Sequence, residues 1–113
     1  MNGRLKNAAV ALSDTNLTAV YTVPTNFTAI VKDVFLTNVD GSAAVDATLK
    51  YTDTSASATF SLLSTKSIAA DDFLRIENAN IILEEGDILK AQAGAANDLE
   101  VTIFVEELYK PQG

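Results

Sequence analysis

The sequence predicts an all-β protein: a single antiparallel β-sandwich of about eight strands, jelly-roll-like or immunoglobulin-like, with little or no helix. Three observations lead to this fold class. Apolar and polar residues alternate with a period of two, polar turn clusters recur about every ten residues, and no stretch keeps a helical period. A chain of 113 residues supports one domain with one core, so we expect residues 1–113 to form one sandwich.

The strands are expected in a regular succession along the chain. Residues 1–12 are expected to form either a first strand, from residue 5, or an N-terminal arm. The other strands are expected at 17–23, 28–38, 44–53, 57–65, 72–83 (broken near Asn78), 87–93 and 99–109. Clusters of turn-forming residues separate them at 13–16, 23–26, 39–42, 53–55 and 68–71.

Two of the middle strands differ in their patterns. In 44–53 every second residue from Val45 is apolar, so one face is expected to be buried and the other exposed. In 28–38 apolar residues such as Ile30 and Phe35 fall on both faces. That pattern indicates a central strand, or a strand with one face in an interface.

The last third of the chain is expected to form a β-hairpin, with strands 87–93 and 99–109 joined by a small, polar loop. Alternate residues of the second strand are aliphatic, which predicts one buried face. The opposite face carries acids and threonine, but also Phe104 and Leu108. Apolar side chains on the solvent face of a small sheet protein suggest that another chain packs there.

The composition argues against an enzyme. The chain has no histidine, cysteine or tryptophan, which excludes serine–histidine–aspartate triads, thiol nucleophiles and the usual zinc sites. Its five scattered glycines form no phosphate-binding loop. A hydrolase that uses only carboxylates is a weak alternative, because no partner such as histidine is present to tune the acids. We therefore expect no catalytic residues, no cofactor and no metal.

Charge and hydropathy limit the partners further. The formal net charge is −7, and the lysines and arginines are scattered singly, so nucleic-acid binding is disfavoured. The apolar run 8–12 follows two basic residues but is too short for a signal peptide or a membrane span. We expect a protein made without a signal peptide and not embedded in a membrane.

Four segments rich in turn residues resemble a known group of proteins. They contain a Tyr-x-Val-Pro turn, an Asn-x-Asp-Gly turn, a Leu-Glu-x-Gly-Asp turn and a terminal strand after Ala-Asn-Asp-Leu. The segments are 19–32, 36–41, 83–89 and 93–101. Together they resemble the small β-sandwich virion proteins of tailed bacteriophages, especially phages of aquatic bacteria. The matched motifs are turn chemistry, and the first strand lies outside them.

The resemblance implies a structural role on the virion. The role it favours is that of a capsid decoration (cement) protein, often a homotrimer, which binds the major capsid protein or other virion proteins. A component of the tail, neck or fibre uses the same kind of fold and remains the alternative. The resemblance supplies no catalytic residues.

Residues at both ends of the chain are the candidates for contact with other subunits. At the C-terminal end these are Phe104, Leu108 and Tyr109. At the N-terminal end they are Arg4, Leu5 and Lys6, which we expect to reach an acidic shell surface as a short basic arm.

A receptor- or carbohydrate-binding module, for example on a phage tail, is the alternative from another functional class. It would need an exposed aromatic platform, or a Ca²⁺ site built from Glu84, Glu85 and Asp87. The plainer interpretation of these acids is a solvated turn, in which glycine takes a positive φ and aspartate bonds the turn backbone.

Overall fold

A computed structural model describes residues 3–110, and all its regular secondary structure is β-strand. The strands are β1 (Gly3–Ala11), β2 (Thr18–Thr22), β3 (Phe27–Asn38), β4 (Val45–Asp53), β5 (Ala58–Ile68), β6 (Phe73–Ile76), β7 (Ile81–Leu83), β8 (Ile88–Ala93) and β9 (Leu99–Tyr109). Within these residues no helix is long and apolar enough to cross a bilayer. The predicted all-β class is confirmed.

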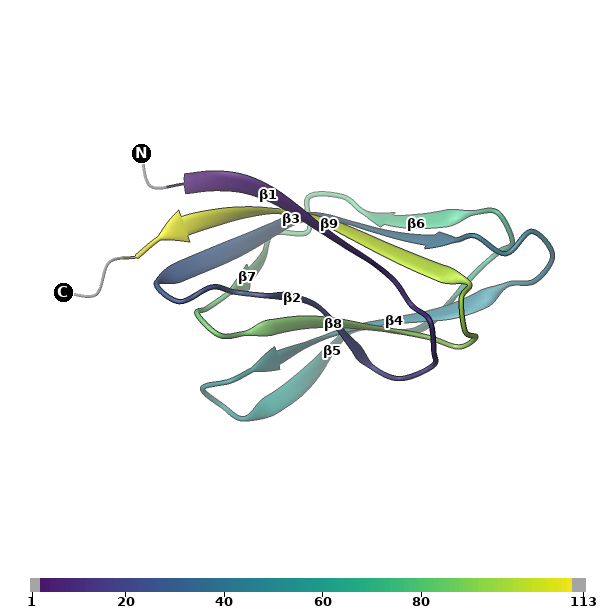
Figure 1. The fold of residues 1–113 in the computed structure, drawn as a ribbon, viewed down its shortest axis with the longest axis horizontal. Helices are drawn as coiled ribbons and strands as arrows, with labels where there is room; N and C mark the ends of the chain where they lie inside the picture. The colour runs from purple at the N-terminus through teal and green to yellow at the C-terminus, as the bar shows by residue number, and fades with distance from the viewer. Residues whose placement is uncertain (1–2, 111–113) are drawn as a thin grey trace.

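The strands form two antiparallel sheets that lie one above the other in Figure 1. Sheet A has the order β1-β9-β3-β6, and β7 pairs with β3 further along the same edge. Sheet B has the order β2-β8-β4-β5. If β6 and β7 are counted as one interrupted strand, this is the order of an eight-stranded jelly roll with two Greek keys. Of the two expected topologies, the chain therefore adopts the jelly roll.

Most predicted strands are confirmed to within a few residues. The break expected near Asn78 is present between β6 and β7, where Asn78 and Asn80 have φ angles of 53° and 51°. The strand expected at 57–65 continues to Ile68, because Thr65, with a φ of 48°, lies in an irregular stretch of the β4–β5 pairing and the ladder resumes after it.

The predicted C-terminal hairpin is wrong. Strand β8 pairs with β2 and β4 in sheet B, whereas β9 pairs with β1 and β3 in sheet A. The loop 94–98 therefore crosses from one sheet to the other. Alternation records only that each strand has one buried face, and two strands on opposite sheets of a sandwich satisfy it equally well.

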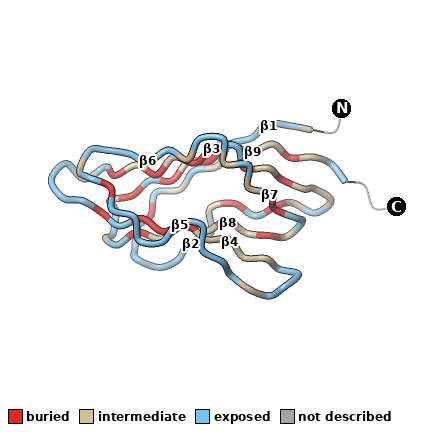
Figure 2. Tube along the Cα trace, turned by 180° about the vertical axis from the view of Figure 1, so that it is seen from behind, coloured by how far each residue is buried: buried red, intermediate tan, exposed pale blue. Residues whose placement is uncertain are grey.

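The core lies between the sheets and is aliphatic. Figure 2 shows the buried positions along the facing strands, and exposed positions in the connections and along the edge strands β1 and β5. Strand β3 is central in sheet A, and its two-sided pattern has a local cause. The register shifts between Val31 and Asp33, so that Val31, Val34 and Leu36 all face the core while Phe35 faces outward.

The described part of the N-terminal segment is a strand. Strand β1 pairs with β9 along its whole length, from Gly3 opposite Leu108 to Ala11 opposite Glu100. Residues 1 and 2 lie outside the described residues. An arm that begins at Arg4 would have to break this pairing.

Candidate functional site on the outer face of sheet A

The two outer faces of the sandwich differ in chemistry. The outer face of sheet B carries charged and amide side chains, among them Asp46, Lys50, Lys90 and Gln92. The outer face of sheet A also carries charged side chains, but large apolar side chains lie between them. We use the name "apolar face" for its residues Leu5, Ile30, Phe35, Phe73, Ile82, Phe104 and Leu108.

Three phenylalanines from three neighbouring strands form the centre of the apolar face. The ring of Phe35 on β3 lies between those of Phe73 on β6, at 6.1 Å, and Phe104 on β9, at 6.0 Å. The first pair is stacked and the second is edge-on, both favourable geometries. The rings remain open to solvent, because Phe73 is 55% and Phe104 is 42% exposed.

Aliphatic side chains extend the apolar face toward the edge strands. Ile30 on β3 lies opposite Ile82 on β7, and Leu5 on β1 lies opposite Glu106 on β9. Leu5 is 81% exposed and Ile82 is 67% exposed. A hollow of about 330 Å³ beside Phe104 is lined partly by Leu5 and Lys32. Projecting side chains and a hollow thus lie side by side on this face.

Both cations beside the rings pair with acidic side chains. Lys32 lies 3.4 Å from Glu106, and Arg75 lies 2.6 Å from Asp33 and 3.8 Å from Glu77. The hydrogen bond from Arg75 lowers the pKa of Asp33, so this carboxylate stays ionised. The guanidinium of Arg75 also lies 5.2 Å from the ring centre of Phe35.

The sequence-predicted contact residues separate into two groups. Leu5, Phe104 and Leu108 lie together on the outer face of sheet A. Arg4 and Lys6 alternate with Leu5 and point to the opposite side of the strand, as does Tyr109 relative to Leu108. A contact through the apolar face would therefore use only the first group.

The second group surrounds a buried acid that the sequence did not single out. The side chain of Glu107 is fully buried, and Arg4 Nε donates a hydrogen bond to it at 2.6 Å. Lys6 Nζ lies 4.0 Å away, and the hydroxyl of Tyr21 donates a second hydrogen bond. The one feature of the sequence that could have predicted its burial is its position, because Glu107 follows Ile103 and Val105 in the buried phase of β9.

Tyr109 belongs to the same end of the sandwich. Its ring lies 5.5 Å from that of Phe27, edge to face, and the guanidinium of Arg4 lies 4.2 Å from the ring centre of Phe27. Arg4 thus contacts both an aromatic ring and the buried acid. These contacts give Arg4 a role within the domain, in place of the free basic arm expected from its charge.

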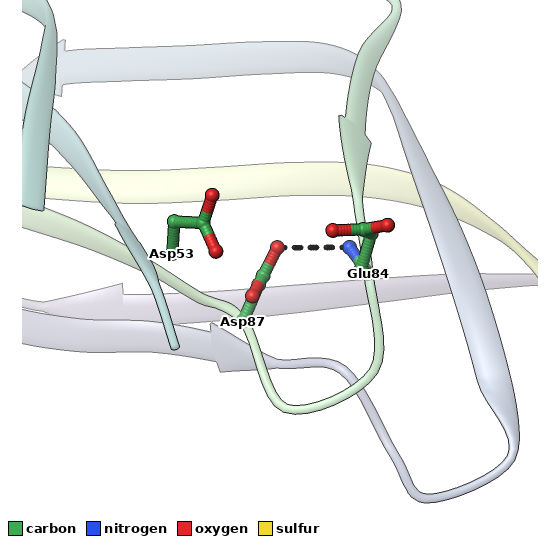
Figure 3. A group of neighbouring side chains, drawn as sticks. All are labelled: Asp53, Glu84 and Asp87. Atoms are coloured by element: carbon green, nitrogen blue, oxygen red, sulfur yellow. Dashed lines mark hydrogen bonds between the residues drawn. The ribbon is translucent and has the colours of Figure 1, made fainter. Parts of the chain in front are cut away.

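The acidic turns come together only in part. Oxygens of Asp53, Glu84 and Asp87 lie within 4.8 Å of one another, so Asp53 takes the place expected for Glu85 (Figure 3). Asp87 is buried and accepts hydrogen bonds from the backbone N–H groups of Thr54, at 3.1 Å, and Glu84, at 2.9 Å. These bonds tie the turn to the neighbouring β4–β5 connection, which is the structural role expected of a turn aspartate.

Comparison with known proteins shows the fold. No protein-family model and no curated protein matches the chain. The core domain of Drosophila NLP, from a study of pentamer formation and histone binding, aligns with a TM-score of 0.54 at 10% identity, over 93% of this chain and 98% of that one. This likeness supports the shared sandwich architecture and, at such identity, nothing about function.

Chains of phage capsids also align over nearly the whole domain. A chain of the cyanophage Pam1 capsid covers 98% of this chain and 88% of its own at 18% identity, with a TM-score of 0.48. A chain of the Helicobacter pylori bacteriophage KHP30 capsid covers 98% and 90% at 12% identity, with a TM-score of 0.45. TM-scores below 0.5 carry no further inference.

Proposed function

We propose that this chain is a non-enzymatic structural protein of a virion, and that it is a capsid decoration (cement) protein. In this role it binds the assembled head shell and stabilises it through subunit contacts. The observation that carries the proposal is the apolar face, with Phe35, Phe73 and Phe104 at its centre. A large exposed apolar patch on a small domain marks an interaction surface.

The fold and the composition are consistent with this role. Viral capsid domains are among the common users of the jelly roll, although the same fold also serves lectins and cupins. The turn motifs that resemble those of phage virion proteins favour the first of these uses. The chain also lacks histidine and cysteine, the residues that most often supply acid–base and nucleophilic chemistry.

The proposal includes the partners. They are the major capsid protein or other virion proteins, together with further copies of this chain in a homotrimer, and the protein's place is the virion. A tail, neck or fibre position is the alternative within the same class.

Purified particles of the phage that encodes the chain test this proposal. Quantitative mass spectrometry should give a copy number that matches the lattice of the head. Particles made without the protein should release their genome at a lower temperature, and added wild-type protein should restore the higher one. A copy number of only a few per particle would assign the protein to the tail or neck, and its absence from particles would refute a virion role.

One observation favours the carbohydrate- or receptor-binding alternative: the exposed rings of the apolar face are also a platform on which a sugar could stack. Calorimetric titration with host glycans and with Ca²⁺ separates the two functions. A decoration protein should give no binding heat with either ligand. Glycan binding that is lost in the Phe73→Ala variant would establish the alternative.

A further inference from the structure

We propose that the apolar face binds a basic segment of a partner protein, one in which lysine or arginine side chains alternate with apolar ones. The inference rests on the proposed function, because it names the chemistry of the partner that the same surface binds. Two properties of the outer face of sheet A support this occupant. Its acids lie between its apolar side chains, and these acids outnumber the cations.

The register of the strands places acids directly beside apolar side chains. Glu106 on β9 lies between Leu5 on β1 and Ile30 on β3. Asp33 on β3 lies opposite Phe104 on β9. Side chains that face each other across neighbouring strands are only about 5 Å apart, so a partner that covers the apolar side chains also covers the acids. A tight fit therefore requires both apolar and cationic groups in the partner.

The charge of this surface is negative. Its charged side chains are four acids and two cations, namely Asp33, Glu77, Glu100 and Glu106 against Lys32 and Arg75. The cations pair with Glu106, at 3.4 Å, and with Asp33, at 2.6 Å. Glu77 lies 3.8 Å from the same Arg75, and among residues 3–110 Glu100 has no ion-pair partner. The excess acids are thus open to cations of another molecule.

A hollow beside Glu100 has the shape for a basic side chain. It has a volume of about 240 Å³ and is lined by Ala9, Ala11 and Thr102 as well as by Glu100. The aliphatic stem of a lysine or arginine can lie over the two alanines while its charged head reaches the carboxylate. The hollow beside Phe104 is suited to an apolar side chain. Four residues of β9, about 13 Å, separate Glu100 from Phe104, a distance that an extended segment spans with four residues of its own.

Charge separates a basic protein from the other classes of partner. The negative face repels the phosphates of nucleic acids, and it equally repels a second copy of this chain, whose net charge is −7. A neutral glycan would stack on the rings but leave the excess acids uncompensated. A protein segment with lysine or arginine compensates the acids and covers the rings at once, as complementary interfaces do.

Titration of the full chain with three synthetic peptides tests the inference. The first peptide repeats Leu-Leu-Lys-Lys, which presents leucine and lysine alternately on each face of an extended strand. In the second peptide glutamate replaces lysine, and in the third serine replaces leucine. Each is added to the ¹⁵N-labelled protein, and the shifts of the backbone amide NMR signals show where it binds.

We expect only the leucine–lysine peptide to bind, with a dissociation constant of about 1 mM or below, and to shift the amides of β1, β9, β3 and β6. Shifts confined to the acidic turns or to sheet B would overturn the inference. So would equal binding of either of the other two peptides, or no binding of any peptide.

Matched variants locate the two kinds of contact. Glu100→Gln and Asp46→Asn remove the same charge from exposed positions on opposite sheets. Circular dichroism should show that both variants fold. We expect Glu100→Gln to weaken binding of the leucine–lysine peptide about threefold and Asp46→Asn to leave it unchanged. Phe73→Ala should weaken it about fivefold. Equal weakening by Glu100→Gln and Asp46→Asn would mean that only the net charge attracts the peptide, which would overturn the inference.

This outcome can be separated from that of the proposed function. Peptide binding is measured on the isolated protein, whereas the virion role is measured on particles. A chain that is present across the head lattice but does not bind the leucine–lysine peptide would overturn only the present inference. A chain that binds this peptide on sheet A but is absent from particles would overturn only the virion role.

Discussion

The hydroxyl of Tyr21 on sheet B donates a hydrogen bond to the carboxylate of Glu107 on sheet A. The same carboxylate accepts a hydrogen bond from Arg4 Nε at 2.6 Å, so one buried acid links the two sheets and the edge strand β1. Burial and the neighbouring carboxylate together raise the pKa of Tyr21 above its ordinary value. The desolvation cost of a buried charge is offset only through its partners, so removal of one partner is strongly destabilising.

Removal of the Tyr21 hydroxyl should destabilise the fold. The Tyr21→Phe variant keeps the ring but leaves the buried carboxylate of Glu107 without one of its donors. We expect the free energy of unfolding to fall by about 2 kcal/mol, the usual magnitude for a hydrogen bond to a charged group. Urea denaturation followed by circular dichroism measures this change.

Tyr51 is the matched control for this prediction. It lies half-buried on β4 of the same sheet, and its ring contacts Phe60. Tyr51→Phe should change the free energy of unfolding by less than about 0.5 kcal/mol. An equal fall in the free energy of unfolding of the two variants would show that the Tyr21–Glu107 hydrogen bond does not stabilise the fold beyond the general effect of losing a tyrosine hydroxyl.

Stability should fall in acid partly through Glu107. Burial alone would raise its pKa, but hydrogen bonds from Tyr21 and Arg4 and the charge of Lys6 more than offset this, so the pKa is lowered. A carboxyl group with a lowered folded-state pKa stabilises the fold above its unfolded pKa of about 4.3, and this contribution is lost as the pH falls through the folded value.

The Glu107→Gln variant tests this dependence. It should be less stable than wild type at neutral pH, and the difference should narrow below about pH 4, where the wild-type carboxylate becomes protonated. Urea denaturation at a series of pH values measures both curves. Curves that stay parallel down to the acid limit would mean that Glu107 does not titrate with folding.

The strands of this protein could be predicted because their main signal is local. Val45, Leu49 and their alternating neighbours face a core whatever lies opposite them, so periodicity was sufficient. The pairing of β8 and β9 was predicted wrongly because it depends on which sheet each strand joins. That choice is made by contacts between residues distant in sequence, such as Val31 with Val105, which no local pattern encodes.

The candidate site could likewise be predicted only where its signal is local. The outward phase of Phe104 could be read from the sequence, and so could the apolar residues on both faces of β3. Their union with Phe73 could not, because it needs the strand order β9-β3-β6. Glu107 was missed for a related reason: an acid is usually solvated, and only its buried phase, together with a distant tyrosine and arginine, shows that it lies inside.

Asp98 should limit stability at neutral pH. Burial, and then the charge and hydrogen bond of the neighbouring Asp40, raise its pKa. The folded state therefore favours its protonated form, and stability is lost as the pH rises through the folded pKa. Asp98→Asn removes the repulsion and keeps a donor for Asp40. We expect a higher melting temperature at neutral pH, and no gain in acid, by differential scanning calorimetry.

Asp40→Asn is the control for the Asp98 variant, because it changes the charge of the same pair by the same amount. Hydrogen bonds from Ser42 lower the pKa of Asp40, so its ionised form is favoured by folding. This variant should lose stability at neutral pH. A gain in both variants would mean that general charge reduction, and not the Asp40–Asp98 pair, sets the melting temperature.

Thr65 should be replaceable by glycine with a gain in stability. Its φ of 48° is a conformation that β-branched residues rarely adopt and that costs a non-glycine residue about 1–2 kcal/mol. Glycine removes this strain at a smaller entropic cost, and the hydrogen bond from the Thr65 N–H to Thr48 Oγ1, at 3.1 Å, is kept. We expect Thr65→Gly to raise the free energy of unfolding by about 0.5–1 kcal/mol, measured by urea denaturation. Ser67→Gly, at an exposed position of the same strand, should lower it by a similar amount, because no strain is relieved there. A loss of stability in both variants would show that the irregular stretch around Thr65 is not strained.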